Sequence, residues 1–397
     1  MHLLLPVFLC MQLACGSIFG AAASGSSAAT GTEPPVSVPS AILMEASTGT
    51  IIYEKNSHES RHPASITKIM TLLLIFEALE NGSIQPGDTV TVSEHASSMG
   101  GSQVFLETGE TQTVDTMIKC ISIASANDAA VAMAEHISGS EEAFVQKMNE
   151  KAAQLGMKDT HFVNCCGLDT DGHLTSAYDI ALMSRELSVR HPKIHDYCTI
   201  WMDTITHVTA RGSSEFGLAN TNKLIRQYSA ATGLKTGSTG LAKFCLSATA
   251  KKDNLELIAV VMGAENPKQR FADARTLLDY GFANCQLYTD TNRKDPGALP
   301  VTGGKQDTVA LTCKGDFSYL CTGGMNPSDI ESSLSLPDSV LAPVKKGDVL
   351  GSLEYRLNGQ VIGSVDVVAA ESVEKATMTD YIASILRQFF KAGVQTA

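Results

Sequence analysis

The run KFCLSATAKKDNLELIAVVMGAENPKQRFADARTLLDYGFANC, residues 243–285, contains the pattern that decides the fold. Two β-type stretches come first, at residues 243–252 and 255–264, and both are rich in apolar residues. A helical stretch, residues 269–285, closes the run. Strands that follow one another before a helix indicate an α/β (α+β) domain with an antiparallel sheet flanked by helices, whereas a doubly wound nucleotide-binding fold alternates strand and helix.

A hairpin and a buried helix are expected nearer the N-terminus. The stretches AILMEA (41–46) and TIIYEK (50–55) are β-type and are joined by Ser47-Thr48-Gly49, which has the composition of a turn. Pro63-Ala64 then precede SITKIMTLLLIFEALEN (65–81), whose apolar content and Asn-Gly stop predict a largely buried helix starting at Ser65. Further helices are expected over roughly 113–138, 141–155 and 175–190.

The length of 397 residues predicts two folded domains with terminal appendages. The first domain is expected to cover residues 36–287. Residues 288–306 are dense in Pro and Gly and lack apolar clusters, which indicates a linker. Residues 307–371 contain short β-type runs separated by turn residues, which predict a small all-β sandwich without an obvious catalytic grouping.

Both ends of the chain differ from the folded domains. Residues 1–23 hold an apolar run that leads into small residues and indicates a secretory signal peptide, although only His2 precedes the run. Residues 24–35, rich in Ser, Ala, Gly and Thr, are expected to be a flexible leader. Residues 372–397 predict an amphipathic helix with an apolar stripe of Met378, Tyr381, Ile382, Ile385, Leu386, Phe389 and Phe390.

Two alternatives concern these ends. The C-terminal helix either lies on a membrane surface, with its two Phe residues in the interface, or docks on the β-sandwich of its own chain. Its few basic residues imply weak or reversible attachment to the membrane.

Cys15 suggests a lipoprotein signal, but Gln12 stands three residues before it, where an aliphatic residue is expected.

Charge and composition exclude several classes of protein. A net charge of -12 without a long Lys/Arg block argues against nucleic acid as a partner. Beyond the first residues, no apolar run is long enough to span a bilayer. Eight cysteines follow the signal, mostly in apolar surroundings that favour buried free thiols; Cys313 and Cys321 are the best candidates for a disulfide. No cysteine spacing is typical of a zinc site.

Three short motifs follow one another in a fixed order: SITK at 65–68, SAN at 125–127 and KTG at 235–237. Singly they are weak evidence, because a second Ser-x-x-Lys, SVEK at 372–375, occurs by chance. A serine hydroxyl needs a base within hydrogen-bond reach, and a lysine three residues later on a helix lies on the same face. Lys68 can therefore accept the proton of Ser65, provided that burial or a nearby charge such as Lys235 lowers its pKa.

The second and third motifs can serve a peptide-like substrate. Ser125 can relay a proton towards a leaving amine and Asn127 can bind a substrate amide, although each taken alone would fit a helix cap. Lys235 and Thr236 can bind a substrate carboxylate, while Gly237 leaves room for a peptide to pair with the strand. The alternative for the third motif is an ordinary turn or exposed strand.

Together the motifs resemble those of the serine penicillin-recognising enzymes, and longer stretches resemble the low-molecular-mass D-alanyl-D-alanine carboxypeptidases over roughly residues 36–285. These stretches include HPASITKIMT, SIASANDAAVAMAEHISGS, LGMKDTHFVNCCGLD and GLKTGSTGLAKFCLSA. The resemblance implies a β-lactamase/transpeptidase-like fold and these roles: Ser65 as acylated nucleophile, Lys68 as general base, Ser125 and Asn127 as the second element, Lys235, Thr236 and Gly237 as the third, the amides of Ser65 and Ser238 as the oxyanion hole, and Arg270 as a ligand of the terminal carboxylate. The chain departs from the family at Ala242-Lys243, where Ala-Gly is usual.

The resemblance implies an extracytoplasmic enzyme that removes the terminal D-alanine from peptidoglycan stem peptides through a Ser65 acyl-enzyme. It implies no metal or organic cofactor, and it implies that β-lactams acylate Ser65. A D,D-endopeptidase and a non-catalytic wall-binding protein are the alternatives. A β-lactamase is disfavoured, because the chain has no Glu-x-x-Leu-Asn element after Ser125 and has Ala126 where those enzymes have Asp.

Overall fold

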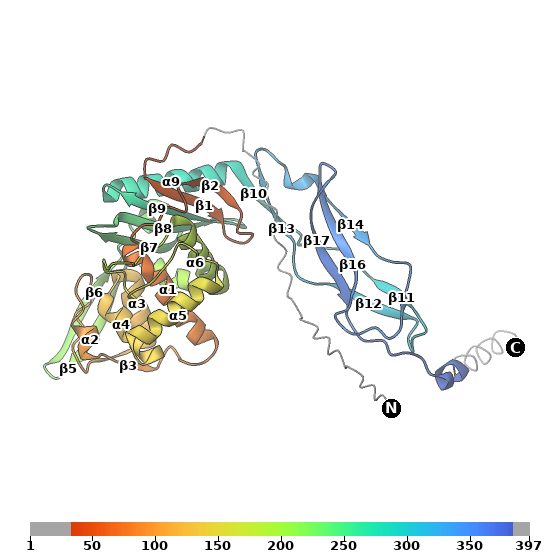
Figure 1. Cartoon of the computed structure of the whole chain (residues 1–397), viewed down its shortest axis with the longest axis horizontal. Helices are drawn as coiled ribbons and strands as arrows, with labels where there is room; N and C mark the ends of the chain where they lie inside the picture. Colours follow the sequence, from red (N-terminus) through yellow and green to blue (C-terminus); the bar gives the residue numbers. More distant parts are fainter. Residues whose placement is uncertain (1–32, 384–397) are drawn as a thin grey trace, which may run out of the picture.

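The computed structural model describes residues 33–383 of the chain. Figure 1 shows a domain of sheet and helices followed by a β-rich domain. The signal peptide predicted at 1–23, nearly all of the leader at 24–35 and residues 384–397 lie outside the described residues. Within the described part, the helix predicted at 372–397 begins only at residue 378. The helices of the described part do not include one that is both long and apolar enough to cross a membrane.

An antiparallel sheet with strand order β2-β1-β9-β8-β7 forms the centre of the first domain, as the run 243–285 predicted. The hairpin predicted at 41–55 is confirmed, since β1 and β2 pair antiparallel. The KTG motif lies on β7, which is an edge strand of this sheet. Its strands are β1 (Ser40–Glu45), β2 (Ile51–Lys55), β7 (Ala231–Thr239), β8 (Lys243–Lys252) and β9 (Leu255–Ala264).

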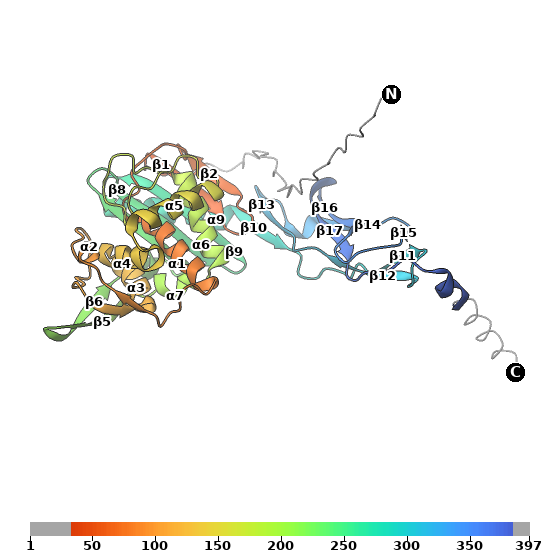
Figure 2. The same cartoon turned by 60° about the horizontal axis from the view of Figure 1, so that its bottom comes forward.

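The sheet is buried on both faces, which explains why β1 and β9 read as continuous apolar runs. Ile42 and Val260 pack into the cluster formed with the helices, whereas Leu43 and Val261 face α9 on the other side. Side chains alternate between the faces of a strand, so both faces must be apolar here. Figures 1 and 2 show α9 on one side and α1, α3, α4, α5 and α6 on the other, and the short α8 packs on the side of α9 through Leu224.

Most of the predicted helices are present in the helical layer, but one of them is divided into three elements. The helix predicted over 113–138 is interrupted by a π-helical turn and by Ser125, so the SAN motif lies at the break. The helical elements are η1 (Ala64–Thr67), α1 (Lys68–Glu80), α2 (Glu94–Ser97), α3 (Val114–Lys119), η2 (Cys120–Ala124), α4 (Asn127–Ser138), α5 (Glu141–Gln154), α6 (Ala177–Arg190), α7 (Ile194–Cys198), α8 (Leu224–Gln227) and α9 (Pro267–Asn284).

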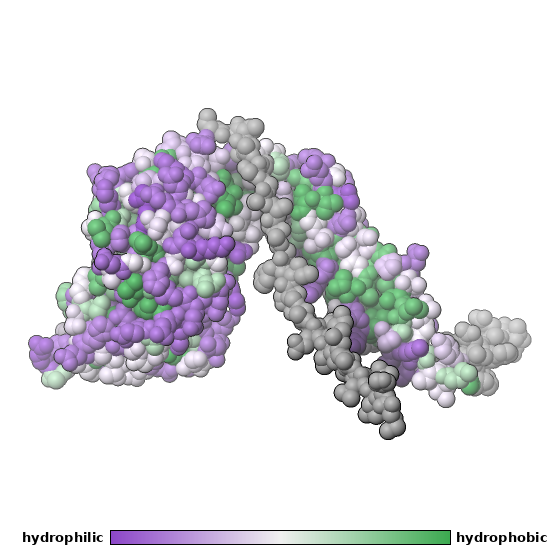
Figure 3. Space-filling model, in the orientation of Figure 1, coloured by the Kyte–Doolittle hydropathy of each residue, from purple (hydrophilic) through white to green (hydrophobic). Residues whose placement is uncertain are grey.

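Two small ladders border the helical layer. Strands β3 (Thr89–Thr91) and β4 (Thr111–Thr113) pair antiparallel, and β5 (Met202–Thr209) pairs with β6 (Gly212–Ala219) in a hairpin. The β5–β6 hairpin, which the sequence analysis did not predict, projects from the domain in Figures 1 and 2. It is mostly hydrophilic on the face that Figure 3 shows.

The C-terminal domain is β-rich, as predicted, but the linker prediction for residues 288–306 is wrong in part. Strand β11 lies inside that range and pairs with β12 and β15, because its alternating Leu299 and Val301 are buried in the domain core. A six-stranded sheet has the order β14-β16-β17-β12-β11-β15, and β10 pairs with β13. The strands are β10 (Cys285–Thr289), β11 (Ala298–Thr302), β12 (Thr308–Cys313), β13 (Ser318–Thr322), β14 (Ile330–Ser335), β15 (Val340–Leu341), β16 (Val349–Leu357) and β17 (Gln360–Ala369), with a short η3 (Pro327–Asp329).

The proposed disulfide between Cys313 and Cys321 is wrong. Cys313 pairs with Val367 of β17, whereas Cys321 lies opposite Gln286 of β10, so the two thiols belong to different ladders. All eight cysteines of the described part are free, and seven of them are buried. They serve as small apolar core residues, as their surroundings in the sequence indicated.

Candidate active site

Ser65 and Lys68 lie together where the η1 turn runs into α1. The predicted helix therefore starts with a 3-10 turn, and Ser65 lies in that turn. The Lys68 Nζ atom is 3.2 Å from the Ser65 Oγ atom. Lys68 is completely buried and also contacts the Asn127 Oδ1 atom at 2.6 Å and the Cys166 carbonyl oxygen at 2.7 Å. The spacing of the first motif thus produces the serine–lysine contact that it predicted.

Burial favours the neutral forms of the two lysines in the site. It lowers the pKa of Lys68, because a low-dielectric surrounding disfavours the ammonium form. It also lowers the pKa of Lys235, and the positive charge of Lys68 lowers it further. A neutral amine has two N–H groups and one lone pair. Asn127 and Cys166 supply two acceptors for those N–H groups, which leaves the lone pair for the Ser65 hydroxyl.

Neither Ser125 nor Asn127 is the N-cap of a helix. Ser125 ends the η2 turn in the left-handed conformation, with φ of 62° and ψ of 32°, which is uncommon for a residue other than glycine. Ala126 is the N-cap residue of α4, and Asn127 is the first residue of that helix. The Asn127 Nδ2 group donates to the Gly100 carbonyl at 2.7 Å while its Oδ1 atom accepts from Lys68. The break between the helices therefore turns Asn127 towards Lys68 of the first motif and Ser125 towards Lys235 of the third.

The third motif approaches the second from the edge of the sheet. Lys235 is buried on β7, and its Nζ atom donates to the Ser125 Oγ atom at 2.8 Å. The Thr236 and Thr221 hydroxyl oxygens are 2.6 Å apart. A Cβ atom on Gly237 would lie 3.0 Å from the Ile66 nitrogen, so only glycine lets β7 pack this closely against the turn that holds Ser65. All three motifs meet in one place.

Three further residues from the sequence analysis surround the third motif. Ser238 follows Gly237 on β7 and pairs with Phe244. Arg270 on α9 is buried, and its NH1 group donates to the carbonyls of Gly237 at 3.2 Å and Cys245 at 3.3 Å, so in this structure it supports the backbone of β7 and β8. Lys243, the departure from the family, forms a half-exposed ion pair with Glu265.

The loop 164–168 is a part of the site that sequence reasoning missed. The Asn164 Oδ1 atom accepts hydrogen bonds from the backbone N–H groups of Cys166, Gly167 and Leu168, at 3.3, 2.6 and 3.2 Å. This turn presents the Cys166 carbonyl to Lys68. The signal in the sequence was Asn164 followed three residues later by Gly167, which is typical of a tight turn.

Replacing Gly167 with alanine is expected to destabilise the protein. A Cβ atom at Gly167 would lie 1.9 Å from the Ala64 carbonyl oxygen, beside Ser65, and φ is +88°. We expect a loss of about 2–4 kcal/mol in the free energy of unfolding and slower acylation. Gly172→Ala is the matched control, because its φ of +79° is similar but no atom lies within 4 Å of the added Cβ. Equal losses in the two variants, measured by urea unfolding, would contradict the steric explanation.

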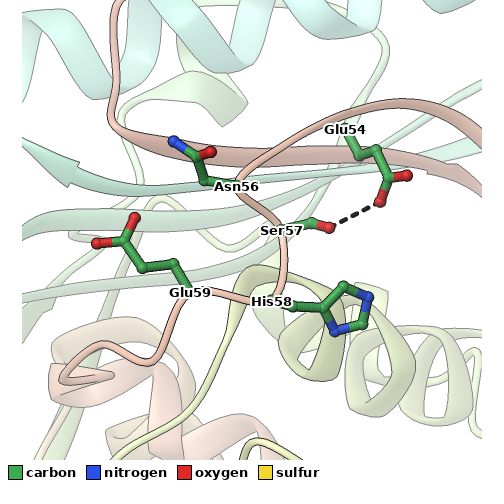
Figure 4. Close-up of a pocket in the computed structure, with 5 residues that line it drawn as sticks. All are labelled: Glu54, Asn56, Ser57, His58 and Glu59. Carbon is green, nitrogen blue, oxygen red and sulfur yellow. Dashed lines mark hydrogen bonds between the residues drawn. The ribbon is translucent and has the colours of Figure 1, made fainter.

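A depression of about 610 Å³ lies outside this constellation. Figure 4 shows its lining residues, which come from the end of β2 and the loop after it: Glu54, Asn56, Ser57, His58 and Glu59. Ser57 donates to Glu54 at 2.7 Å, and His58 contacts Asp159. None of the motif residues lines it. The depression is therefore separate from the three motifs.

A serine with a buried lysine as partner, held between a helical layer and the edge of an antiparallel sheet, defines a serine hydrolase of the penicillin-recognising class. Residues 27–266 match the family described as D-alanyl-D-alanine carboxypeptidase, and residues 288–375 match the C-terminal domain of penicillin-binding protein 5. The carboxypeptidase DacF of Bacillus subtilis is 46% identical over 344 residues, 86% of this chain and 87% of the relative. The carboxypeptidase DacA of Escherichia coli is 32% identical over 369 residues, 90% of each chain. The solved structure of penicillin-binding protein 5 from Haemophilus influenzae matches with a TM-score of 0.74 and 30% identity, and covers 87% of this chain and 100% of its own.

The chain belongs to the D-alanyl-D-alanine carboxypeptidase family. It is a serine hydrolase that removes the terminal D-alanine from peptidoglycan stem peptides. Membership in this family supports a peptidoglycan substrate ending in D-alanyl-D-alanine, the binding of β-lactams and an extracytoplasmic location.

Proposed function

We propose that Ser65 is the acylated nucleophile of this carboxypeptidase and that neutral Lys68 is its general base. The observation that carries the assignment is the contact of 3.2 Å between Lys68 Nζ and Ser65 Oγ, made by a completely buried lysine. Lys68 takes the hydroxyl proton as Ser65 attacks the carbonyl between the two D-alanines. The backbone amides of Ser65 and Ser238 stabilise the negative charge that develops on the carbonyl oxygen.

The second and third motifs complete acylation. Ser125, which accepts a hydrogen bond from Lys235, passes its proton to the leaving nitrogen as the C–N bond breaks and D-alanine departs. Ser125 regains a proton from Lys68, the one that Lys68 took from Ser65, so Lys68 is neutral again. Asn127 binds the substrate amide and orients Lys68. Lys235 and Thr236 bind the terminal carboxylate, and Arg270 contributes positive charge behind them. Water, deprotonated by Lys68, then hydrolyses the acyl ester and restores the Ser65 hydroxyl.

Mass spectrometry of the penicillin adduct tests this assignment. The purified protein is incubated with benzylpenicillin, digested, and searched for the peptide that gains the mass of one penicilloyl group. The adduct is expected on the peptide that contains Ser65. An adduct on Ser125 instead would assign the nucleophile to the second motif and overturn the proposed roles.

We propose further that the C-terminal helix attaches the enzyme reversibly to the outer face of the cytoplasmic membrane. The described turns of this helix, residues 378–383, leave Met378, Tyr381 and Ile382 exposed. Burial of such an apolar stripe in the interface favours membrane binding. The exposure of these three side chains supports membrane binding, while the Tyr381 hydroxyl lies near Gly303 of the β-rich domain.

Replacing Phe389 and Phe390 together with serine is expected to weaken sedimentation of the full chain with anionic phospholipid vesicles by about 10-fold or more, because the stripe loses two large apolar side chains. Gln388→Ala, on the polar face, is the matched control and should sediment like the wild type. Unchanged sedimentation of the double variant would favour docking on the protein.

A further inference from the structure

An exposed aromatic residue, Phe105, is held in an unusual backbone conformation beside the active site. Its φ is +62°, and its side chain is 64% exposed. A left-handed conformation costs a bulky residue roughly 1–2 kcal/mol, so the surrounding structure must impose it. An exposed apolar ring displayed at this cost calls for an explanation other than packing.

The buried carboxylate of Asp128 imposes the conformation. Its oxygens accept hydrogen bonds from the backbone N–H groups on both sides of Phe105, those of Val104 at 3.2 Å and Leu106 at 3.1 Å. Val104 and Leu106 are themselves buried. The chain is therefore anchored before and after Phe105, and its ring is directed outwards.

The ring of Phe105 forms one wall of a depression of about 440 Å³ against the β5–β6 hairpin. It meets the Phe216 ring edge-on, with centroids 5.9 Å apart, and Phe216 in turn contacts the ring of His207. His207 bonds the buried Glu110 at 2.8 Å, and Gln112 donates to the Thr206 carbonyl at 2.9 Å. These bonds fix the hairpin to the body of the domain, so the two aromatic walls are preorganised.

Two short stretches of chain connect this aromatic depression with the motif residues. The Ser102 carbonyl accepts from the Asn127 N–H at 2.7 Å, and Phe105 is three residues further on, a span of at most about 11 Å. At the other wall, β6 leads from Phe216 to Thr221, which contacts Thr236. Three or four residues of an extended peptide cover about 10–14 Å, which is comparable with the span between Ser102 and Phe105.

We infer that Phe105 and Phe216 form a binding subsite for the part of the stem peptide that lies upstream of the two D-alanines. The inference rests on the proposed function and adds a determinant of substrate length. The aromatic faces cover the aliphatic portion of the peptide. The rim of the depression also carries both signs of charge, Arg211 with Glu107 and the exposed Glu215, which suits a peptide that bears amino and carboxylate groups.

The test compares two substrates, a stem pentapeptide and N-acetyl-D-alanyl-D-alanine, which has no upstream residues. For Phe105→Ala, we expect kcat/KM for D-alanine release to fall about 10-fold on the pentapeptide and less than about twofold on the short substrate. The rate of acylation by benzylpenicillin should not change. Phe105→Tyr should restore the preference for the pentapeptide. Val208→Ala is the matched control, since Val208 is exposed on the same hairpin but does not line the depression.

The possible outcomes separate this inference from the proposed function. An equal loss on both substrates would show that Phe105 shapes the reaction centre, and no loss on either would show that the ring contacts no substrate; both results overturn the subsite. Failure of the wild-type protein to release D-alanine from either substrate would instead overturn the proposed function. A loss of acylation by penicillin in Phe105→Ala would indicate a misfolded site, in which case the Tyr variant alone decides, and loss of its length preference overturns the inference.

Discussion

Replacing Ser65 with alanine is expected to abolish both the release of D-alanine from a stem pentapeptide and covalent labelling by penicillin. The hydroxyl that forms the acyl ester is lost, and the other serine of the motifs, Ser125, bonds Lys235 and not Lys68. Removal of the nucleophile from a catalytic constellation lowers kcat by roughly 10⁴- to 10⁶-fold. The measurement is free D-alanine against time, with gel detection of a fluorescent penicillin as the second readout.

The chain supplies its own matched control for this variant. Ser372 begins the second Ser-x-x-Lys pattern, but it lies in the β-rich domain, where its Oγ atom only accepts a hydrogen bond from the Lys346 N–H. Ser372→Ala is therefore expected to retain full activity. Retained penicillin labelling in Ser65→Ala would refute the assignment of the nucleophile, whatever the control shows.

Replacing Lys68 with arginine is expected to slow acylation by about 10²- to 10⁴-fold, because a guanidinium stays protonated and cannot accept the serine proton. In the wild type, acylation should accelerate with rising pH as Lys68 loses its proton, and burial places this transition below the ordinary lysine value of 10.5. The measurement is the rate of penicillin acylation across a pH series. Lys243→Arg, a surface lysine beside the third motif, should keep both the rate and the profile.

The same shift in the pKa of Lys68 predicts the sign of a stability change. Between its lowered pKa in the folded protein and 10.5, the unfolded chain binds a proton that the folded chain has released. The free energy of unfolding therefore rises with pH through this window, and it does not fall as it would for a lysine with a raised pKa. The lowered pKa of Lys235 changes the free energy of unfolding in the same direction.

A wild-type acylation rate independent of pH, or an active Lys68→Arg variant, would contradict the role of Lys68 as a base.

Local pattern was sufficient for the main elements of the fold. The strands at 243–252 and 255–264 match β8 and β9, because a sheet buried on both faces requires continuous apolar runs. The linker at 288–306 was predicted from dense Pro and Gly and a lack of apolar clusters, and β11 within it was missed because two alternating apolar residues carry little signal. The β5–β6 hairpin was missed because its residues are mostly polar and exposed.

The sequence by itself determined the class of enzyme, the motif residues and the contact between Ser65 and Lys68, since residues three apart share a helix face. Only the tertiary structure decided what surrounds them. The Cys166 carbonyl, the left-handed Ser125 and the hydroxyl of Thr221 belong to segments far apart in the chain. The types of residues in the sequence do not predict where a backbone carbonyl points or where a distant loop lies. The pKa of Lys68 likewise depends on burial, and burial exists only after these segments have packed together.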